Sequence, residues 1–262
     1  MDGRIPNIRS DLHQRMGYRL KMGRDDRPNR WYQLFFGLVV FSILGSLAER
    51  LLGADPGLIK PIAGAATLCS GVLALLTQIS RDESASKAIK AFLGLVFIGA
   101  GSEILGIYTG LPFGKYAYTD AWAPVVVLPG GHFFPVLLPL AWVMMVASGY
   151  AITARVLSGF WAIFLCALLA TLADLPLEFA VIHSLKYWTW LDPSWPIGDV
   201  GFGVPILNSV GWFGTSFLGA MVLSRFAPPS ESSRNIAVRV LGSLTLLMVA
   251  LSLIAQLPVL KR

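Results

Sequence analysis

Cysteine, histidine and charged residues are scarce in this sequence, which has two cysteines, three histidines and 14% charged residues. Cys69 and Cys166 have no His or Cys at the spacing of metal ligands, and we expect both to be small buried apolar side chains. No HExxH motif, His-rich cluster or Gly-rich phosphate loop is present. The sequence therefore lacks the motifs of zinc proteases, iron-dependent desaturases and phosphate-binding enzymes.

Long apolar runs are the main feature that is present. The chain is 55% hydrophobic with a mean hydropathy of +0.65, and its apolar runs of about twenty residues match a helix that crosses a bilayer. We expect an all-α, polytopic membrane helical bundle of about seven transmembrane helices, with a basic tail at residues 1–30 and a single transmembrane domain at residues 31–262. The expected spans are Tyr32–Leu52, Pro61–Ile79, Ala88–Tyr108, His132–Thr153, Ser158–His183, Val204–Phe226 and Ile236–Val259.

The basic residues are distributed unevenly. Eight of the 21 Lys and Arg residues lie in residues 1–30, and most of the others fall in alternate connections between the spans. This bias predicts a cytoplasmic N-terminus and an external C-terminus, in the inner membrane of a bacterium. The net charge of +6 then reflects topology and contact with membrane lipids, and we expect no nucleic-acid partner.

Four carboxylates lie within the limits of the expected spans, all toward the outer side of the membrane: Glu49, Glu103, Asp174 and Glu178. A charge in hydrocarbon costs about 2.5–3.5 kcal/mol on insertion scales, so an intramembrane acid is a candidate functional residue. The seventh span contains no lysine, so a retinal Schiff base has no anchor.

Asp174 and Glu178 are separated by one helical turn, with Pro176 between them. Proline leaves the carbonyl of Leu172 without its helical partner, which predicts a kink and a small wet pocket. Two carboxylates this close do not both ionise easily in a low-dielectric site, so we expect them to share one proton. The alternative is a structural hydrogen-bonded pair.

The other polar residues of the spans have less distinctive surroundings. Glu103 precedes a Gly/Pro/aromatic loop, whereas Glu49 is followed by Arg50 and could simply form an interfacial ion pair. Asn208 could orient a carboxylate or join two helices. His132 offers an accessible imidazole at the start of the fourth span, and His183 resembles a boundary residue.

Two long outer connections, Thr109–Gly131 and Ser184–Gly203, are rich in Gly, Pro and aromatic residues. Aromatic residues are typical of a membrane interface whatever the function. Long loops of compact proteins are usually functional or disordered, and this aromatic content argues against disorder.

A resemblance to a known family begins at Glu103. The segment Glu103–Thr119, EILGIYTGLPFGKYAYT, resembles the most distinctive block of the carotenoid biosynthesis family of integral membrane proteins, whose members include carotenoid end-group hydratases. Other blocks follow in the family's order: Pro135–Trp142, Asp174–Glu178, Tyr187–Trp190, and Gly203–Pro205 with Asn208 and Gly211–Trp212. The resemblance covers roughly residues 49–212. Relatives usually read Asp-Leu-x-Leu-Asp-Pro at the fifth span, whereas this chain has Glu178-Phe179 and a proline at 176, which puts the substrate or regiochemistry in doubt.

The resemblance implies hydration of the terminal double bond of an acyclic carotenoid end group, with the carotenoid supplied from the bilayer. Such a reaction needs a proton donor, a stabilised tertiary cation and a positioned water, but no cofactor and no metal. We expect Asp174 and Glu178 to give the proton and Glu103 with Asn208 to orient the water. The expected substrate contacts are Tyr116, Tyr118, Trp188, Trp190, Trp212, Phe113, His132 and Glu49.

Three other functions remain open from the sequence. The same pocket could belong to a non-catalytic carotenoid-binding or assembly protein. A proton-coupled transporter would have acids on both sides of the membrane and an internal repeat, and neither is visible. Asp174 and Glu178 resemble half of a magnesium–diphosphate motif, but a second Asp-rich segment is missing. The sequence does not indicate protein partners.

Overall fold

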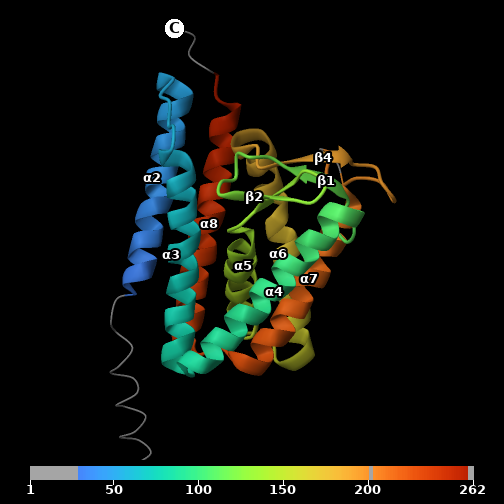
Figure 1. Cartoon of the computed structure of the whole chain (residues 1–262). Helices are drawn as coiled ribbons and strands as arrows, with labels where there is room; N and C mark the ends of the chain where they lie inside the picture. The colour runs from blue at the N-terminus through green and yellow to red at the C-terminus, as the bar shows by residue number, and fades with distance from the viewer. Residues whose placement is uncertain (1–28, 201–202, 259–262) are drawn as a thin grey trace, which may run out of the picture.

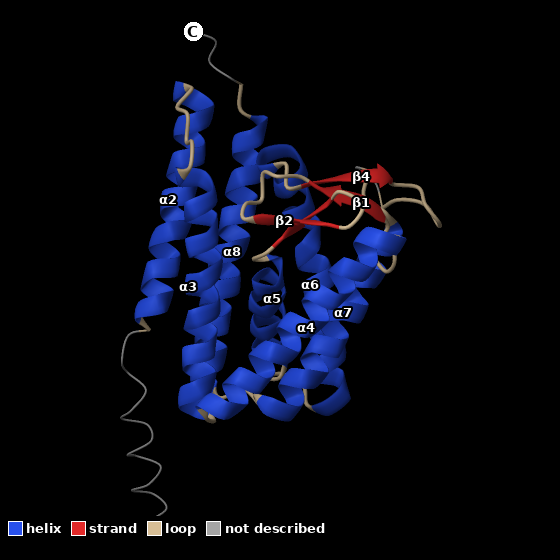
Figure 2. Ribbon diagram, viewed as in Figure 1, coloured by secondary structure: helices blue, strands red, loops and turns tan. Residues whose placement is uncertain are grey.

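The computed structural model describes residues 29–200 and 203–258, and the described part of the chain is a bundle of seven α-helices with four short strands (Figure 1). Most of the expected basic tail lies outside the described residues. Figure 2 shows that the strands gather at one end of the bundle. The α-helices are α2 (Arg30–Leu52), α3 (Ile59–Asp82), α4 (Ala85–Thr109), α5 (Leu138–Thr153), α6 (Gly159–Ala180), α7 (Ile206–Phe226) and α8 (Glu231–Gln256).

Six of these helices are long and apolar enough to cross a membrane, and they present large apolar side chains on the outside of the bundle. Phe97 on α4, for example, is 79% exposed. A surface of this kind is stable in lipid rather than in water. The chain is therefore an integral membrane protein with an all-α, polytopic bundle, and the expected fold class is confirmed.

The fourth expected span is wrong over its first six residues. The helix α5 begins at Leu138, whereas His132–Pro135 forms the strand β3. Pro135 and Pro139 favour this boundary, because a proline costs a helix one hydrogen bond except in the first turn, where Pro139 lies. Thirteen of the 16 residues of α5 are buried, so this short helix is the centre of the bundle.

The two long aromatic connections contain two antiparallel strand pairs. The strand β1 (Lys115–Tyr118) pairs with β4 (Trp188–Asp192), and β2 (Val125–Leu128) pairs with β3. In the first pair Tyr116 is opposite Trp190, and Tyr118 is opposite Trp188. Since alternate residues of a strand share a face, all four aromatic rings belong to one face of this pair.

The helix α6 carries the proline expected to disturb it. Pro176 lies inside α6, and the helix continues past it to Ala180 before it widens into the π-helical turn η1 (Val181–Leu185). The strand β4 follows directly. Because the helix widens at η1 and then ends, the aromatic segment Trp188–Trp190 turns back over the end of α6.

The helix ends define the two sides of the bundle. The helix α2 begins at one end, where the Asn29 side chain caps it by accepting a hydrogen bond from the Tyr32 amide. The last helix, α8, ends at the opposite end, which is also the end with the strands (Figure 1). The two helix ends lie on opposite sides because the chain runs along the bundle an odd number of times. The residues that form the candidate site lie toward the end with the strands.

Candidate active site

A small cavity of about 60 Å³ lies where α4, α5, α6 and α7 meet the β1–β4 pair. We call it the acid cavity, because two of the intramembrane acids line it. A water molecule needs about 10–15 Å³ of such space, so the cavity has room for several water-sized groups. Its lining residues are Glu103, Phe113, Tyr116, Tyr118, Trp122, Leu138, Ala141, Trp142, Leu177, Glu178, Trp188, Trp190, Asn208 and Trp212.

Glu103 on α4 is buried and accepts hydrogen bonds from three side chains. The Tyr116 hydroxyl lies 2.6 Å and the Tyr118 hydroxyl 2.8 Å from Glu103 Oε2, and Trp142 Nε1 lies 2.9 Å from Oε1. All three partners are donors, and an ionised carboxylate is an acceptor only. This environment is therefore matched to the charged form of Glu103.

The expected pair on α6 is connected through Asn208, which lies on α7. Asn208 Nδ2 donates to Asp174 Oδ2 at 2.6 Å and to Glu178 Oε1 at 3.0 Å. Glu178 Oε2 also accepts from Trp188 Nε1 at 3.3 Å and from Trp190 Nε1 at 3.2 Å. One amide thus holds both carboxyl groups.

The two members of the pair differ in their surroundings. Glu178 lines the acid cavity and has three donors, whereas Asp174 does not line it and has one. The other oxygen of Asp174, Oδ1, is buried without a hydrogen-bond partner among the described residues. Since an unpaired charged oxygen is costly to bury, a neutral Asp174 beside a charged Glu178 is the state that this geometry favours at rest.

No residue that lines the acid cavity is Lys, Arg or His. Glu103 and Glu178 therefore line one space without a cation among the lining residues, and Asp174 shares Asn208 with Glu178, so the three buried carboxyl groups do not all ionise together easily. Among the described residues, no group of three or more His, Cys, Asp or Glu side chains could hold a metal ion.

The two tyrosines that contact Glu103 remain neutral donors. Burial and the adjacent charge of Glu103 raise the pKa of Tyr116 well above its usual value, and the same two causes act on the pKa of Tyr118. Both hydroxyls thus keep their protons throughout the neutral range. The register of β1 with β4 fixes them beside Trp190 and Trp188, with ring centroids 5.6 Å and 6.0 Å apart.

Close packing of small residues fixes the remaining rings. Phe113 is 3% exposed, and a Cβ at Gly211 would lie 2.3 Å from Phe113 Cδ1. A Cβ at Gly106 would lie 2.6 Å from the Tyr116 hydroxyl. Trp142 and Trp212 have centroids 4.4 Å apart. Glycine is therefore required at both positions for the rings to approach the helices.

Two expected contact residues lie elsewhere. His132 is on β3, where its ring meets Tyr108 edge-on at 5.3 Å, and it does not line the acid cavity. Glu49 lines a second cavity and pairs with Lys60, whose Nζ lies 3.0 Å from Oε2. Its sequence neighbour Arg50 instead donates to the carbonyls of Ala255 and Leu257, so the suggested Glu49–Arg50 pair is wrong.

Several lining residues were not singled out from the sequence, and Trp142 and Trp122 are the most informative. A buried indole N–H requires an acceptor, so the tryptophan in the middle of the fourth span could have been matched to an intramembrane acid. Trp122 gave no such signal, because it belongs to an irregular part of the first long connection. The remaining three are the apolar residues Leu138, Ala141 and Leu177.

Comparison with known proteins gives one match. The model of the family described as carotenoid biosynthesis protein matches residues 63–260, which is more than half of the chain and includes Glu103, Asp174, Glu178 and Asn208. A search of curated proteins and a search of solved structures each gave no match. The match confirms the resemblance that the sequence blocks indicated. The chain belongs to the carotenoid biosynthesis protein family, and its role is in the biosynthesis of carotenoids.

Proposed function

We propose that this protein adds water to the terminal double bond of an acyclic carotenoid end group and gives a tertiary alcohol. The observation that carries the proposal is the acid cavity, in which Glu103 and Glu178 line one space walled by aromatic rings. Hydration needs a proton donor and a proton acceptor that line one space, in which a water molecule lies beside the alkene. The family match supports a role in carotenoid biosynthesis, and the cavity supports this particular reaction.

The proton comes from the pair on α6. Glu178 lines the cavity, so it is the group that touches the substrate. Asp174, the second carboxyl group of the pair, lies outside the cavity lining and is joined to Glu178 through Asn208. At rest the one proton of the pair is on Asp174; when this proton moves to Glu178, the negative charge passes to Asp174 and Glu178 becomes the acid. The O–H bond of Glu178 breaks as a C–H bond forms at the less substituted alkene carbon, which leaves a tertiary cation on its neighbour.

Glu103 serves as the base. It orients a water molecule in the cavity, and the oxygen of that water forms a bond to the cationic carbon while one of its protons passes to Glu103. Tyr116, Tyr118 and Trp142 hold the carboxylate for this step. Transfer of the proton from Glu103 back to Glu178 restores the starting state, and the net change is the addition of one water.

The aromatic walls favour the cation. The N–H groups of Trp142, Trp188 and Trp190 all donate to Glu103 or Glu178, which fixes the orientation of each ring around the cavity. A ring face stabilises a desolvated cation by about 2 kcal/mol or more in favourable cases. Rings held in place before the reaction provide this stabilisation without reorganisation.

The size of the acid cavity is consistent with an acyclic end. Its volume of about 60 Å³ exceeds the roughly 10–15 Å³ that a single water needs, so a water can lie there beside part of a substrate. An open-chain end with two methyl groups is narrower than a cyclic end group and suits so small a space.

The expected membrane orientation agrees with this chemistry. We infer that the strand end, with the acid cavity, is the outer face of a bacterial inner membrane, because the basic N-terminal segment favours the cytoplasm at the other end. A carotenoid is about as long as the bilayer is thick, so one end group reaches this face while the polyene stays in lipid.

Expression of the protein in a host that makes an acyclic carotene tests the proposal. Mass spectrometry of the pigments should find a product heavier by one water, with its new oxygen labelled when the cells grow in H₂¹⁸O. Unchanged pigment from acyclic and monocyclic carotenes would overturn the proposal and would favour the carotenoid-binding or assembly protein as the alternative.

A further inference from the structure

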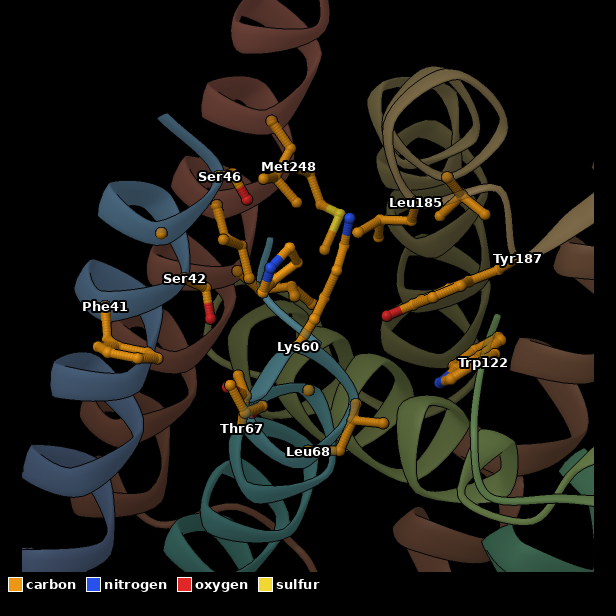
Figure 3. A pocket seen from close by; sticks show the side chains of 18 of the residues that line it. Phe41, Ser42, Ser46, Lys60, Thr67, Leu68, Trp122, Leu185, Tyr187 and Met248 are labelled. Atoms are coloured by element: carbon orange, nitrogen blue, oxygen red, sulfur yellow. The ribbon is translucent and has the colours of Figure 1, made fainter. Parts of the chain in front are cut away.

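A second, larger cavity of about 340 Å³ lies beside the acid cavity. We call it the wide cavity, and Figure 3 shows side chains of α2, such as Phe41, Ser42 and Ser46, on one side of it and Trp122, Leu185 and Tyr187 on the other. The helices α3, α5 and α8 complete its lining, mostly with Ala, Leu, Met and other apolar side chains. Its volume is more than five times that of the acid cavity.

The two cavities have a common wall. Five residues line both, and they come from the first long connection, from α5, α6 and α7, and from β4: Trp122, Ala141, Leu177, Trp188 and Trp212. Two spaces that share five side chains are adjacent, and the smaller one contains the acids. A molecule in the wide cavity can therefore extend one end toward Glu103 and Glu178.

The charged residues that line the wide cavity are Glu49, Asp55 and Lys60. Lys60 pairs with Glu49, and the two side chains are 36% and 39% exposed, so the bundle does not enclose this pair. Asp55 and Pro56 of the α2–α3 connection line the same part. The deeper lining contains Met144, Met145 and other apolar groups, and thioethers adapt well to a long flexible ligand.

We infer that the wide cavity binds the polyene chain next to the reacting end of the carotenoid. This inference rests on the proposed function, since it assigns the rest of the same substrate to a second part of the site. Trp122 of the common wall stacks on Tyr187, which lines the wide cavity alone, with centroids 4.7 Å apart and planes at 12°. Flat rings at this position suit a flat conjugated chain, and the remainder of the chain extends beyond the cavity into lipid.

Gly45 on α2 provides a direct test. It lines the wide cavity, and a Cβ built there meets nothing within 4 Å, so Gly45→Phe places a ring in the cavity without a backbone clash. Gly37 lies on the same helix, also has nothing within 4 Å, and does not line the cavity. The matched control is therefore Gly37→Phe, with the same helix, the same substitution and a lipid-facing position.

The measurement is quenching of tryptophan fluorescence by an acyclic carotene titrated into the full chain in lipid nanodiscs. Trp122, Trp188 and Trp212 lie at the common wall, and a bound polyene absorbs their emission energy. Gly45→Phe should weaken binding by about tenfold or more because it fills space that the ligand needs, whereas Gly37→Phe should bind as the unsubstituted protein does. Equal affinity for all three proteins would overturn the inference.

A second variant covers the case in which Gly45→Phe does not fold. Ser46→Leu also adds volume to the cavity lining, and no hydrogen bond of the Ser46 side chain has to be broken among the described residues. It should weaken binding in the same direction. If Ser46→Leu folds and retains full affinity, the wide cavity does not hold the polyene.

Binding and turnover separate this inference from the proposed function. Loss of binding in Gly45→Phe without any hydrated product from the unsubstituted protein would support the polyene site and overturn the hydratase. Hydrated product formed equally by both proteins would support the hydratase and overturn the polyene site.

Discussion

Tyr116 and Trp190 are direct partners in the antiparallel pair of β1 and β4, and each donates a hydrogen bond to a different intramembrane carboxylate. The tyrosine donates to Glu103 on α4, and the tryptophan donates to Glu178 on α6. One strand pair thus fixes both acids relative to each other. The predictions below follow from this coupling.

Glu178 and Asp174 should differ when each is replaced by its amide. Glu178→Gln removes the carboxyl that lines the cavity and should lower turnover by about 10²–10⁴-fold, the usual contribution of a general acid. Asp174→Asn should lower kcat by less and leave KM unchanged, because Asp174 does not line the cavity. Pigment conversion by purified variants gives both constants.

Glu83→Gln is the control for the two amide variants. Glu83 forms a surface ion pair with Lys87, and such pairs contribute little, so activity should be unchanged. Full activity of Glu178→Gln would show that the proton comes from another group.

Gly106→Ala should lower activity, whereas Gly101→Ala on the same helix should not. The new methyl at position 106 would lie 2.6 Å from the Tyr116 hydroxyl and would push it away from Glu103. Misplacement of a catalytic group by about 1 Å can cost about 10²-fold in rate. The control position is exposed and has nothing within 4 Å of its Cβ.

Both alanine variants should fold, since alanine is favoured over glycine in a helix by about 1 kcal/mol. The decisive measurement is turnover at matched amounts of folded protein. Equal rates for the two variants would mean that the Tyr116 contact with Glu103 has no part in the reaction.

Trp142→Phe should lower the stability of the protein. It removes the donor to Glu103 Oε1, which has no other donor among the described residues, and an unsatisfied buried acceptor costs about 1–3 kcal/mol. The midpoint of thermal unfolding in one detergent measures the loss. Trp161→Phe is the matched control, because Trp161 is 62% exposed on the outside of α6 and should change the midpoint little.

Alkaline pH should destabilise the protein through Tyr116 and Tyr118. Both hydroxyls keep their protons in the folded state because burial and Glu103 raise their pKa values, whereas in the unfolded chain they ionise near pH ~10. The unfolded state then binds fewer protons, so the free energy of unfolding falls as pH rises above about 10. Unfolding midpoints between about pH 9 and about pH 11 should fall less steeply in the Tyr116→Phe/Tyr118→Phe double variant.

The sequence was sufficient for the helices, because length and hydropathy alone identify a segment that must satisfy its backbone in lipid. It was not sufficient at His132–Pro135. That segment is apolar and lies directly before α5, so hydropathy alone places it in the span, whereas it pairs with β2 across the short turn at residues 129–131. The strand β2 was missed with its hairpin partner β3, and β1 was missed because its partner β4 lies in the other long connection.

The acids were identifiable from the sequence, but their arrangement was not. Spacing alone placed Asp174 and Glu178 on one helix face, and the structure agrees. It did not reveal that Asp174 lies outside the cavity lining, since that depends on how α7 and its Asn208 pack against α6. The alternation Tyr116-x-Tyr118 and Trp188-x-Trp190 was the available sign of two strands with one aromatic face.

The helix α2 makes its main contacts with α3 and α8, and it lies before the segment matched by the family. It contributes residues such as Phe41 and Gly45 to the wide cavity but none to the acid cavity. Under the proposed function, changes along α2 can therefore reshape the space for the polyene while Glu103, Asp174 and Glu178 stay where they are. Within one scaffold, the choice of molecule and the reaction performed on it are free to diverge separately.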